Sequence, residues 1–304
     1  MKRWITYQRE RFPLIAHAPL VAAFSVSAVC FSRLVRGESG WPAWPSVTVA
    51  FVTALTFFLQ LRISDEFKDF ADDAKYRPSR PVPRGLVTLR ELGWVGVGAG
   101  IIQLALALWL QPALVGLLAL AWAYLALMSR EFFVAGWLRG RPALYMASHM
   151  VIIPLIDLYA TACDWLLVDS RPPRGLIWFL LVSYVNGIVV EVGRKTRAPA
   201  DEEPGVETYS ADWGLATAVA VWLSAIAITA ILAWQAARQI EFAGRVVPLL
   251  IVLVGLSLWT GVRLARHPAP GGGKAIEIAS GVWTLLMYLS LGAIPALLAT
   301  RGWR

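Results

Sequence analysis

Long apolar stretches separated by short polar segments dominate the hydrophobic pattern of this chain. Nine of them are candidate membrane spans, covering residues 13–34, 46–63, 93–110, 112–128, 142–164, 174–192, 211–234, 246–265 and 276–299. A helix needs roughly 20 mostly apolar residues to cross a bilayer. Because backbone groups in lipid must pair internally, such stretches are expected to be helical. The pattern predicts an all-α integral membrane protein, with nine transmembrane helices in a single bundle and cytoplasmic loops capping one end.

The segments between these stretches indicate how the bundle is connected. Only Gln111 and Pro112 separate the third and fourth stretches, which predicts a tight helical hairpin. The segments 62–91 and 193–210 are long and polar, whereas 266–275 is a connector rich in Pro and Gly. No polar block is long enough to form a soluble domain, so we expect a single transmembrane domain over residues 1–304. The basic start runs directly into an apolar stretch, so we expect no cleavable signal peptide.

The composition is that of a membrane protein, and the distribution of charge predicts how the chain is oriented in the membrane. The chain is 58% hydrophobic and 16% charged, whereas a soluble chain is usually about half apolar and a quarter charged. If the N-terminus is cytoplasmic, the cytoplasmic segments hold 20 of the 28 Lys and Arg residues. This bias explains the net charge of +8 without a nucleic-acid partner. We therefore predict a protein of a bacterial cytoplasmic membrane, with its N-terminus inside and its C-terminus outside.

An acidic row follows the second apolar stretch. Asp65, Asp69 and Asp73 are spaced at i, i+4 and i+8, which places the three carboxylates on one face of a helix, with Glu66 and Asp72 beside them. Like charges at this spacing weaken a helix by a few tenths of a kcal/mol per pair. A divalent cation relieves that repulsion, and Mg²⁺ is typically held by one or two carboxylates together with substrate phosphates. A solvated, internally salt-bridged loop is the alternative explanation.

A basic run comes directly after the acidic row. Arginine suits phosphate oxygens because its planar fork donates two hydrogen bonds, and lysine adds a point charge. Prolines at 78, 81 and 83 stiffen the backbone between the basic residues. We predict a diphosphate site from this run, which consists of Lys75, Arg77, Arg80 and Arg84.

Together these residues resemble the first motif of the UbiA superfamily of intramembrane prenyltransferases. That motif is written N-D-x-x-D-x-x-x-D, followed by R-P…G. Here it stands as Asp65-Glu66-x-x-Asp69-x-x-x-Asp73, with Arg80-Pro81…Gly85 downstream. Asp replaces the usual Asn, and Glu replaces the usual first Asp. The position after the second of nine helices also agrees, and the resemblance covers nearly the whole chain.

The resemblance implies Mg²⁺-dependent transfer of a prenyl group from an isoprenoid diphosphate to an acceptor that the residues do not identify. It implies catalytic roles for Asp65, Asp69 and Asp73. The expected partners are the isoprenoid diphosphate and the lipid bilayer, and no protein partner can be inferred. Two alternatives are a membrane terpene cyclase of the same superfamily, and a transporter or binding protein for cations or phosphate compounds.

The second half of the expected site departs from the family pattern. The family has D-x-x-x-D after the sixth helix, but neither possible register here restores two acids: one pairs Glu191 with Lys195, and the other pairs Arg197 with Asp201. We therefore predict that Arg194, Lys195 or Arg197 contacts the diphosphate in place of a second metal; an ordinary Glu191–Lys195 ion pair is the alternative. The predicted metal ligands are Asp65, Glu66, Asp69, Asp73, Glu191 and Asp201.

Polar residues inside the spans complete the set of candidates, because charge in lipid is costly. Asp157 lies within the stretch 142–164 and Asn186 lies near Glu191, so both are candidates for an acceptor pocket. Arg130, at the end of the fourth stretch, is a further candidate for phosphate binding. We expect His149 to be a packed or hydrogen-bonded histidine rather than a base.

Overall fold

Helices account for every regular element in the computed structural model, which describes residues 2–301. The long helices are α2 (Leu14–Val35), α3 (Trp44–Lys68), α5 (Leu89–Leu110), α6 (Leu114–Ser129), α10 (Leu176–Arg194), α12 (Leu215–Gln239), α13 (Ala243–Arg266) and α14 (Gly272–Leu291). The shorter ones are α1 (Lys2–Arg11), α4 (Phe70–Tyr76), η1 (Glu131–Phe133), α7 (Ala135–Arg139), α8 (Pro142–Met150), α9 (Ile152–Trp165), η2 (Pro199–Asp201), α11 (Tyr209–Trp213) and α15 (Ala293–Ala299).

These helices reproduce the predicted membrane spans. Within residues 2–301, 8 candidate spans are long and apolar enough to cross a membrane, with α8–α9 and α14–α15 each counted as one. Helix α6 is apolar but shorter, at 16 residues. Together they coincide with the nine predicted stretches, so the prediction of an all-α integral membrane protein is confirmed. The tight hairpin predicted at Gln111-Pro112 is also confirmed, since it joins α5 to α6.

Two spans are interrupted, and proline explains both breaks. A proline lacks the N–H that would bond four residues back, and its ring crowds that carbonyl. Pro154 removes the bond to residue 150, where α8 ends and α9 begins. Pro295 likewise removes the bond to Leu291, and α14 gives way to α15 at Gly292.

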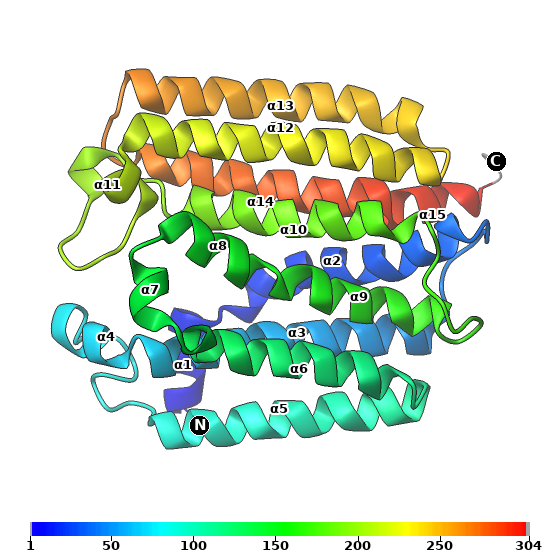
Figure 1. The fold of residues 1–304 in the computed structure, drawn as a ribbon, viewed down its shortest axis with the longest axis horizontal. Coiled ribbons are helices and arrows are strands. Elements are labelled where there is room, and N and C mark those ends of the chain that lie inside the picture. Colours follow the sequence, from blue (N-terminus) through cyan, green and yellow to red (C-terminus); the bar gives the residue numbers. More distant parts are fainter. Residues whose placement is uncertain (1, 302–304) are drawn as a thin grey trace.

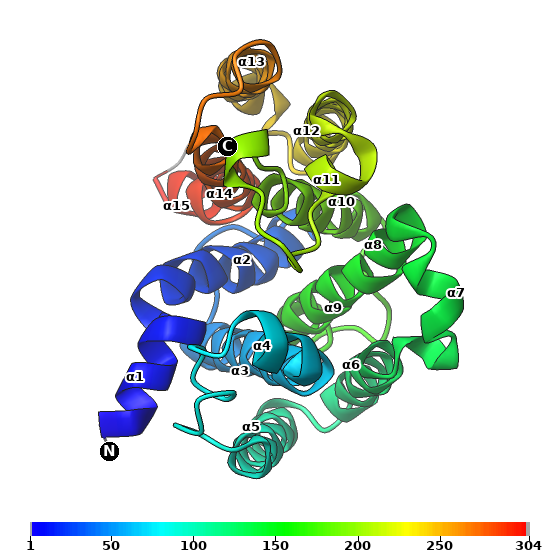
Figure 2. The same ribbon diagram turned by 90° about the vertical axis from the view of Figure 1, so that its left-hand side faces the viewer.

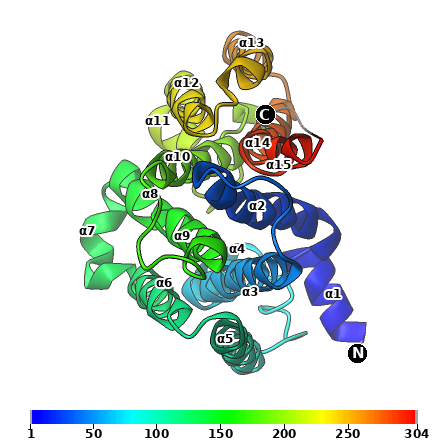
Figure 3. The same ribbon diagram turned by 90° about the vertical axis from the view of Figure 1, so that its right-hand side faces the viewer.

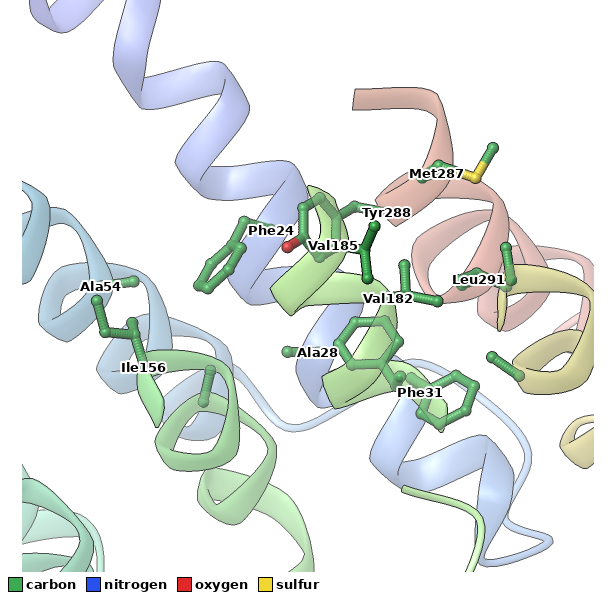
Figure 4. Packing of buried hydrophobic residues seen from close by; sticks show 14 of the residues in the cluster. Phe24, Ala28, Phe31, Ala54, Ile156, Val182, Val185, Met287, Tyr288 and Leu291 are labelled. Carbon is green, nitrogen blue, oxygen red and sulfur yellow. The ribbon is translucent and has the colours of Figure 1, made fainter. Parts of the chain in front are cut away.

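The bundle has a packed centre and two exposed edges. Helices α2, α10 and α14–α15 are central, with 50%, 50% and 61% of their most apolar parts buried, against 22% for α5 and 28% for α13. Viewed along the helices, α12 and α13 lie at one edge and α5 and α6 at the other (Figures 2 and 3). In the centre, the ring of Phe179 stacks on Phe31 at 4.7 Å and meets Tyr288 edge-on at 5.9 Å. Figure 4 shows Phe31 and Tyr288 among the buried residues of this core.

A polar network inside the membrane ties α3, α5 and α6 together. Gln103 of α5 is fully buried; its amide nitrogen donates to the Gln60 side chain at 3.1 Å, and its oxygen accepts from the Trp122 indole at 2.7 Å. The Gln60 amide in turn donates to the Gly96 carbonyl at 3.1 Å. Because these side-chain groups hydrogen-bond to one another, the network joins the three helices through polar groups that have partners.

Candidate functional site

Both charged segments singled out in the sequence lie at the same end of the bundle. This polar end, at the left of Figure 1, carries α1, α4, α7, α11 and the loops 77–88, 195–208 and 267–271. The last described residues of the C-terminus lie at the opposite end (Figure 1). Because successive spans alternate in direction, every second loop lies at the same end of the bundle. Segments more than a hundred residues apart therefore share one surface.

The acidic residues lie in two environments, and the helix that carries them is interrupted within the row. Helix α3 ends at Lys68, and Asp69, at φ −92° and ψ 5°, separates it from α4. Glu66, before the break, and Asp73, after it, are each only 2% exposed. A buried carboxylate must be paired or protonated, so the partners of these two residues decide their role.

Arginines neutralise both buried carboxylates. The Arg80 Nη1 donates to the two Asp73 oxygens at 2.7 and 2.6 Å, and the Arg77 Nη1 lies 3.3 Å from the same carboxylate. The Arg11 guanidinium pairs with Glu66 and also lies 3.8 Å from Asp73. Arg77 and Arg80, which were predicted to bind phosphate, are therefore paired with Asp73. Glu66 and Asp73, which were predicted to bind a metal, are therefore paired with arginines.

The sequence interpretation missed Arg11. It belongs to α1, 55 residues before Glu66, in the basic segment that the charge pattern explained only as a sign of membrane orientation. No spacing relates it to the acidic row. The only signal was its position among basic residues close to a membrane boundary, which fits many residues equally well.

The turn after Asp73 depends on one glycine. The Arg84 N–H donates to the Arg80 carbonyl and the Leu86 N–H to the Pro81 carbonyl, which folds the segment back on itself. Gly85 has φ +75°, a conformation that costs glycine little. The R-P…G element thus holds Arg80 beside Asp73.

Asp65, in α3, and Asp69, at the break itself, are less compensated by nearby cations. Asp65 is 3.7 Å from Arg62, and Asp69 makes no ion pair within 4 Å among residues 2–301. Burial raises the pKa of the Asp69 carboxyl above its usual value; the charges of Asp65 and Asp73 raise it further, while Lys68 and Lys195 oppose them. Asp65 and Asp69 therefore carry carboxylate charge that an added cation would stabilise.

The second segment contributes mainly positive charge to the same place. Glu191 is held by Arg194 at 2.7 Å and by Lys195 at 3.0 Å, and the Lys195 ammonium also lies 5.5 Å from the centre of the Tyr209 ring. Arg194 is within electrostatic range of Asp65, and Lys195 is within range of Asp69. Asp65 and Asp69 of the first segment are thus within electrostatic range of cations of the second segment.

Asp201 follows a different course. Its carboxylate accepts the Gly271 N–H at 2.7 Å, and Arg197 pairs with Glu203 at 3.4 Å. These residues line a cleft of about 250 Å³ between the loops 195–208 and 267–271. Of the two possible registers, the structure brings the Glu191–Lys195 pair to Asp65 and Asp69.

A glycine contact joins the two segments directly. Gly205 has φ +76°, and its Cα packs so closely on Tyr76 of α4 that a Cβ there would lie 2.5 Å from the ring. The loop 195–208 therefore rests on α4, and the conformation of each segment depends on the other.

The remaining predicted residues lie around or below this centre. Lys75 is exposed beside Tyr76, Arg84 pairs with Glu10 at 2.9 Å, and Arg130 is exposed at the end of α6. Their part in phosphate binding stays a prediction.

The predicted acceptor-pocket residues come together in the bundle centre. Asp157 accepts from Ser183 and is fully buried, while Asn186 accepts from the Trp283 indole at 3.1 Å. The Tyr288 hydroxyl, visible in Figure 4, lies close to both Asp157 and Asn186. The structure thus places a polar cluster where the sequence placed a pocket, and an acceptor role stays a prediction.

The donor set of Asp65 and Asp69 fits Mg²⁺. Among residues 2–301, no group of three or more His, Cys, Asp or Glu side chains is arranged to hold an ion. Mg²⁺ does not need such a group, because one or two carboxylates and substrate phosphates satisfy it. The uncompensated charge at Asp69 is what such an ion would neutralise.

Replacing Asp69 with asparagine should stabilise the protein in the absence of donor and Mg²⁺. A raised carboxyl pKa in the folded state means that stability falls as pH rises from the ordinary Asp value, about 3.9, through the folded value. We expect Asp69→Asn to raise the melting temperature by a few degrees at neutral pH, and the gain to vanish in acid, where the wild-type carboxyl is protonated. Thermal unfolding in detergent across pH measures this; a gain that is equal at every pH would contradict it.

Comparison with known proteins identifies the fold. No family model matches the chain, and no curated protein matches it in sequence. A solved structure described in work on digeranylgeranylglyceryl phosphate synthase in membranes superposes with a TM-score of 0.63 at 14% identity, covering 97% of this chain and 99% of that one. A UbiA homologue from Aeropyrum pernix K1 superposes with a TM-score of 0.67 at 12% identity, covering 88% of this chain and 95% of that one. The chain therefore has the fold of the UbiA-type membrane proteins, as the resemblance of its acidic motif predicted.

Proposed function

We propose that this protein transfers a prenyl group, inside the membrane, from an isoprenoid diphosphate to an acceptor. The observation that carries the proposal is that Asp65 and Asp69 lie within electrostatic range of Arg194 and Lys195 at the polar end. A metal–diphosphate complex needs both signs of charge, carboxylates for the cation and basic groups for the phosphate oxygens. The UbiA fold supports the same assignment.

Each group has a defined part in this proposal. Asp65 and Asp69 would hold Mg²⁺, which would supply positive charge to the diphosphate leaving group. Arg194 and Lys195 bind diphosphate oxygens directly. Glu191, between them, fixes the two cations in place through ion pairs of 2.7 and 3.0 Å. Apolar helix faces below the site exclude water from the allylic carbon.

The polar end faces the cytoplasm in this proposal, since it carries most of the Lys and Arg residues. An isoprenoid diphosphate has a charged head and an apolar tail. Such a molecule entering from the cytoplasmic leaflet would place its head at the polar end and its tail among the helices. The orientation is tested by introducing single cysteines at each end and labelling them with a thiol reagent that does not cross membranes. If the reagent labels Arg84→Cys from outside intact bacterial protoplasts, the polar end faces outward and the proposed orientation is wrong.

Replacing Lys195 with alanine should weaken donor binding. One hydrogen bond to a charged group contributes about 1.5–3 kcal/mol, so affinity for prenyl diphosphate should fall about tenfold to a hundredfold. Glu191 keeps its ion pair with Arg194, so folding should survive. The matched control is Lys274→Ala, which removes a lysine paired with Glu277 on α14. Binding measured by isothermal titration in detergent checks this, and an unchanged affinity in a folded Lys195→Ala protein would remove Lys195 from the site.

Radiolabelled donors decide among the reactions open to this fold. Purified protein is incubated with Mg²⁺ and geranyl, farnesyl or geranylgeranyl diphosphate, with and without a lipid extract as the source of acceptor. Diphosphate release with a labelled adduct supports prenyl transfer. Release with hydrocarbon or alcohol products and no adduct indicates a cyclase. Donor binding or uptake without turnover indicates a transporter or binding protein.

A further inference from the structure

A buried histidine below the polar end has one nitrogen tied to the backbone and the other without a partner. His149 of α8 is 7% exposed. Its Nδ1 lies 2.8 Å from the Tyr145 carbonyl, which can only accept, so Nδ1 carries the proton. Nε2 therefore presents a lone pair, and it is buried with no hydrogen-bond partner among the described residues. His149 is packed and hydrogen-bonded through Nδ1, as the sequence led us to expect, but this bond uses only one of its two nitrogens.

The imidazole is held firmly by its neighbours. Its ring stacks on Tyr145 at 3.8 Å and 15°, and Phe132 meets it edge-on at 5.7 Å. Two tyrosines from other helices fix the backbone of α8 beside it: Tyr124 donates to the Ser148 carbonyl at 2.6 Å and Tyr184 to the Ala147 carbonyl at 3.1 Å. A group positioned so firmly suits a directional proton transfer.

The segment that covers His149 is strained. Glu131, Phe132 and Phe133 have φ of 47°, 53° and 60°, three consecutive residues other than glycine in the left-handed region. Each such residue costs on the order of 1–3 kcal/mol, and strain of this kind is concentrated at functional sites. The strained turn places the Phe132 ring against both His149 and Tyr124.

His149 also borders the proposed donor site. Lys68 donates to the Tyr145 hydroxyl, and its ammonium lies 5.1 Å from the centre of the Tyr145 ring, which stacks on His149. The charges facing His149 are Lys68 and Asp65 from α3 and Glu131 from the strained turn. Tyr145 thus connects His149 to Lys68, the neighbour of Asp69 in the proposed donor site.

We propose that Nε2 of His149 is the general base that deprotonates a hydroxyl acceptor, an inference that rests on the proposed prenyl transfer. The acceptor oxygen forms a bond to the allylic carbon, whose bond to the diphosphate oxygen breaks and leaves the electron pair on diphosphate. The hydroxyl proton passes to Nε2, so the imidazole becomes imidazolium. A neutral base without a competing partner is suited to this step, because an unused lone pair accepts a proton without first breaking a hydrogen bond. The acceptor class is therefore an alcohol or phenol.

One substitution separates the two nitrogens of the ring. In His149→Asn the amide nitrogen takes the place of Nδ1 and keeps a donor for the Tyr145 carbonyl, while nothing replaces Nε2. The matched control is His17→Asn. His17 also has Nδ1 beside a carbonyl four residues back, at 3.0 Å from Pro13, and also stacks on an aromatic ring, that of Phe12.

Two small acceptors test the base directly. Wild type and both variants are reconstituted in nanodiscs with Mg²⁺ and tritiated geranylgeranyl diphosphate, with phenol or 4-nitrophenol as acceptor at a pH where only 4-nitrophenol is ionised. In His149→Asn we expect transfer to phenol to fall about a hundredfold or more. Transfer to 4-nitrophenolate should stay near the wild-type rate, because that acceptor needs no base. His17→Asn should match wild type with both.

Other outcomes overturn the inference. An equal loss with both acceptors would assign His149 a structural role, and no loss with either would remove it from the reaction. Wild-type protein that binds the donor but transfers to neither phenol overturns the base and leaves the donor site in place. Wild-type protein that does not bind the donor overturns the proposed function itself, and with it this inference.

Discussion

Asp69→Asn is expected to lower prenyl transfer by about a thousandfold, measured as kcat/KM for the donor. Removing one preorganised group that stabilises developing charge typically lowers a rate by about 10²–10³-fold. Asp69 lacks an ion pair of its own among residues 2–301, so its charge is available to a cation at the diphosphate. Since the same substitution is expected to stabilise the apo protein, the lost activity cannot be attributed to unfolding.

A carboxylate three residues away provides the control. Asp72 lies in α4, next to Asp73, the last member of the acidic row. Its side chain is exposed, so it belongs neither with the buried pair Glu66 and Asp73 nor with Asp65 and Asp69. Asp72→Asn changes the net charge by the same amount and should leave kcat/KM near the wild-type value. If Asp69→Asn and Asp72→Asn behave alike, in either direction, Asp69 has no special place in the site. Donor binding measured with and without Mg²⁺ separates a lost cation ligand from a lost phosphate contact.

Gly292→Ala is expected to destabilise the bundle by about 3 kcal/mol or more, at the upper end of what overpacking usually costs. A Cβ at Gly292 would lie 2.2 Å from the Ser27 carbonyl oxygen, 2.4 Å from its Cα and 2.6 Å from its carbonyl carbon. All three are backbone atoms of α2, so no side chain can rotate away. The helices must move apart where the break between α14 and α15 meets α2, which is one of the central helices.

A second glycine on the same helix makes the test specific. Gly281 of α14 has open space where its Cβ would be, so Gly281→Ala should leave stability unchanged or raise it by up to about 1 kcal/mol through helix propensity. Thermal unfolding of both variants in the same detergent compares them. Equal melting temperatures would mean that α14 and α2 are not packed as closely as described.

The number and type of spans could be predicted from sequence because they depend on local properties. A hydrophobic length and the need to pair backbone groups in lipid require only the composition of each stretch. Boundaries were less accurate where a helix extends beyond the membrane: the stretch 46–63 ends where polarity begins, yet α3 continues to Lys68. The interruptions at Pro154 and Pro295 each divided one predicted stretch into two helices that together make one candidate span.

The sequence predicted where the candidate site lies, but not which of its charged residues pair with one another. The spacing of Asp65, Asp69 and Asp73 indicated one acidic face, but the break at Asp69 turned Asp73 toward Arg80 and Arg11. The sequence offered two registers for the second segment, and only the folded loops distinguish them. Asp201 is held by the Gly271 N–H, 70 residues away, and periodicity carries no information about such a contact.

The sequence by itself determined a helical membrane bundle with an acidic motif and basic segments gathered at one end. Those features follow from local hydrophobicity, and from the alternation of spans that returns every second loop to the same side. Only the tertiary structure decided which carboxylates are neutralised, which remain for a cation, and that a buried histidine nitrogen is left without a hydrogen-bond partner among the described residues. The physical reason is that charge pairing and burial depend on how helices rotate and pack against one another, which involves residues too far apart in the chain for any local pattern to relate.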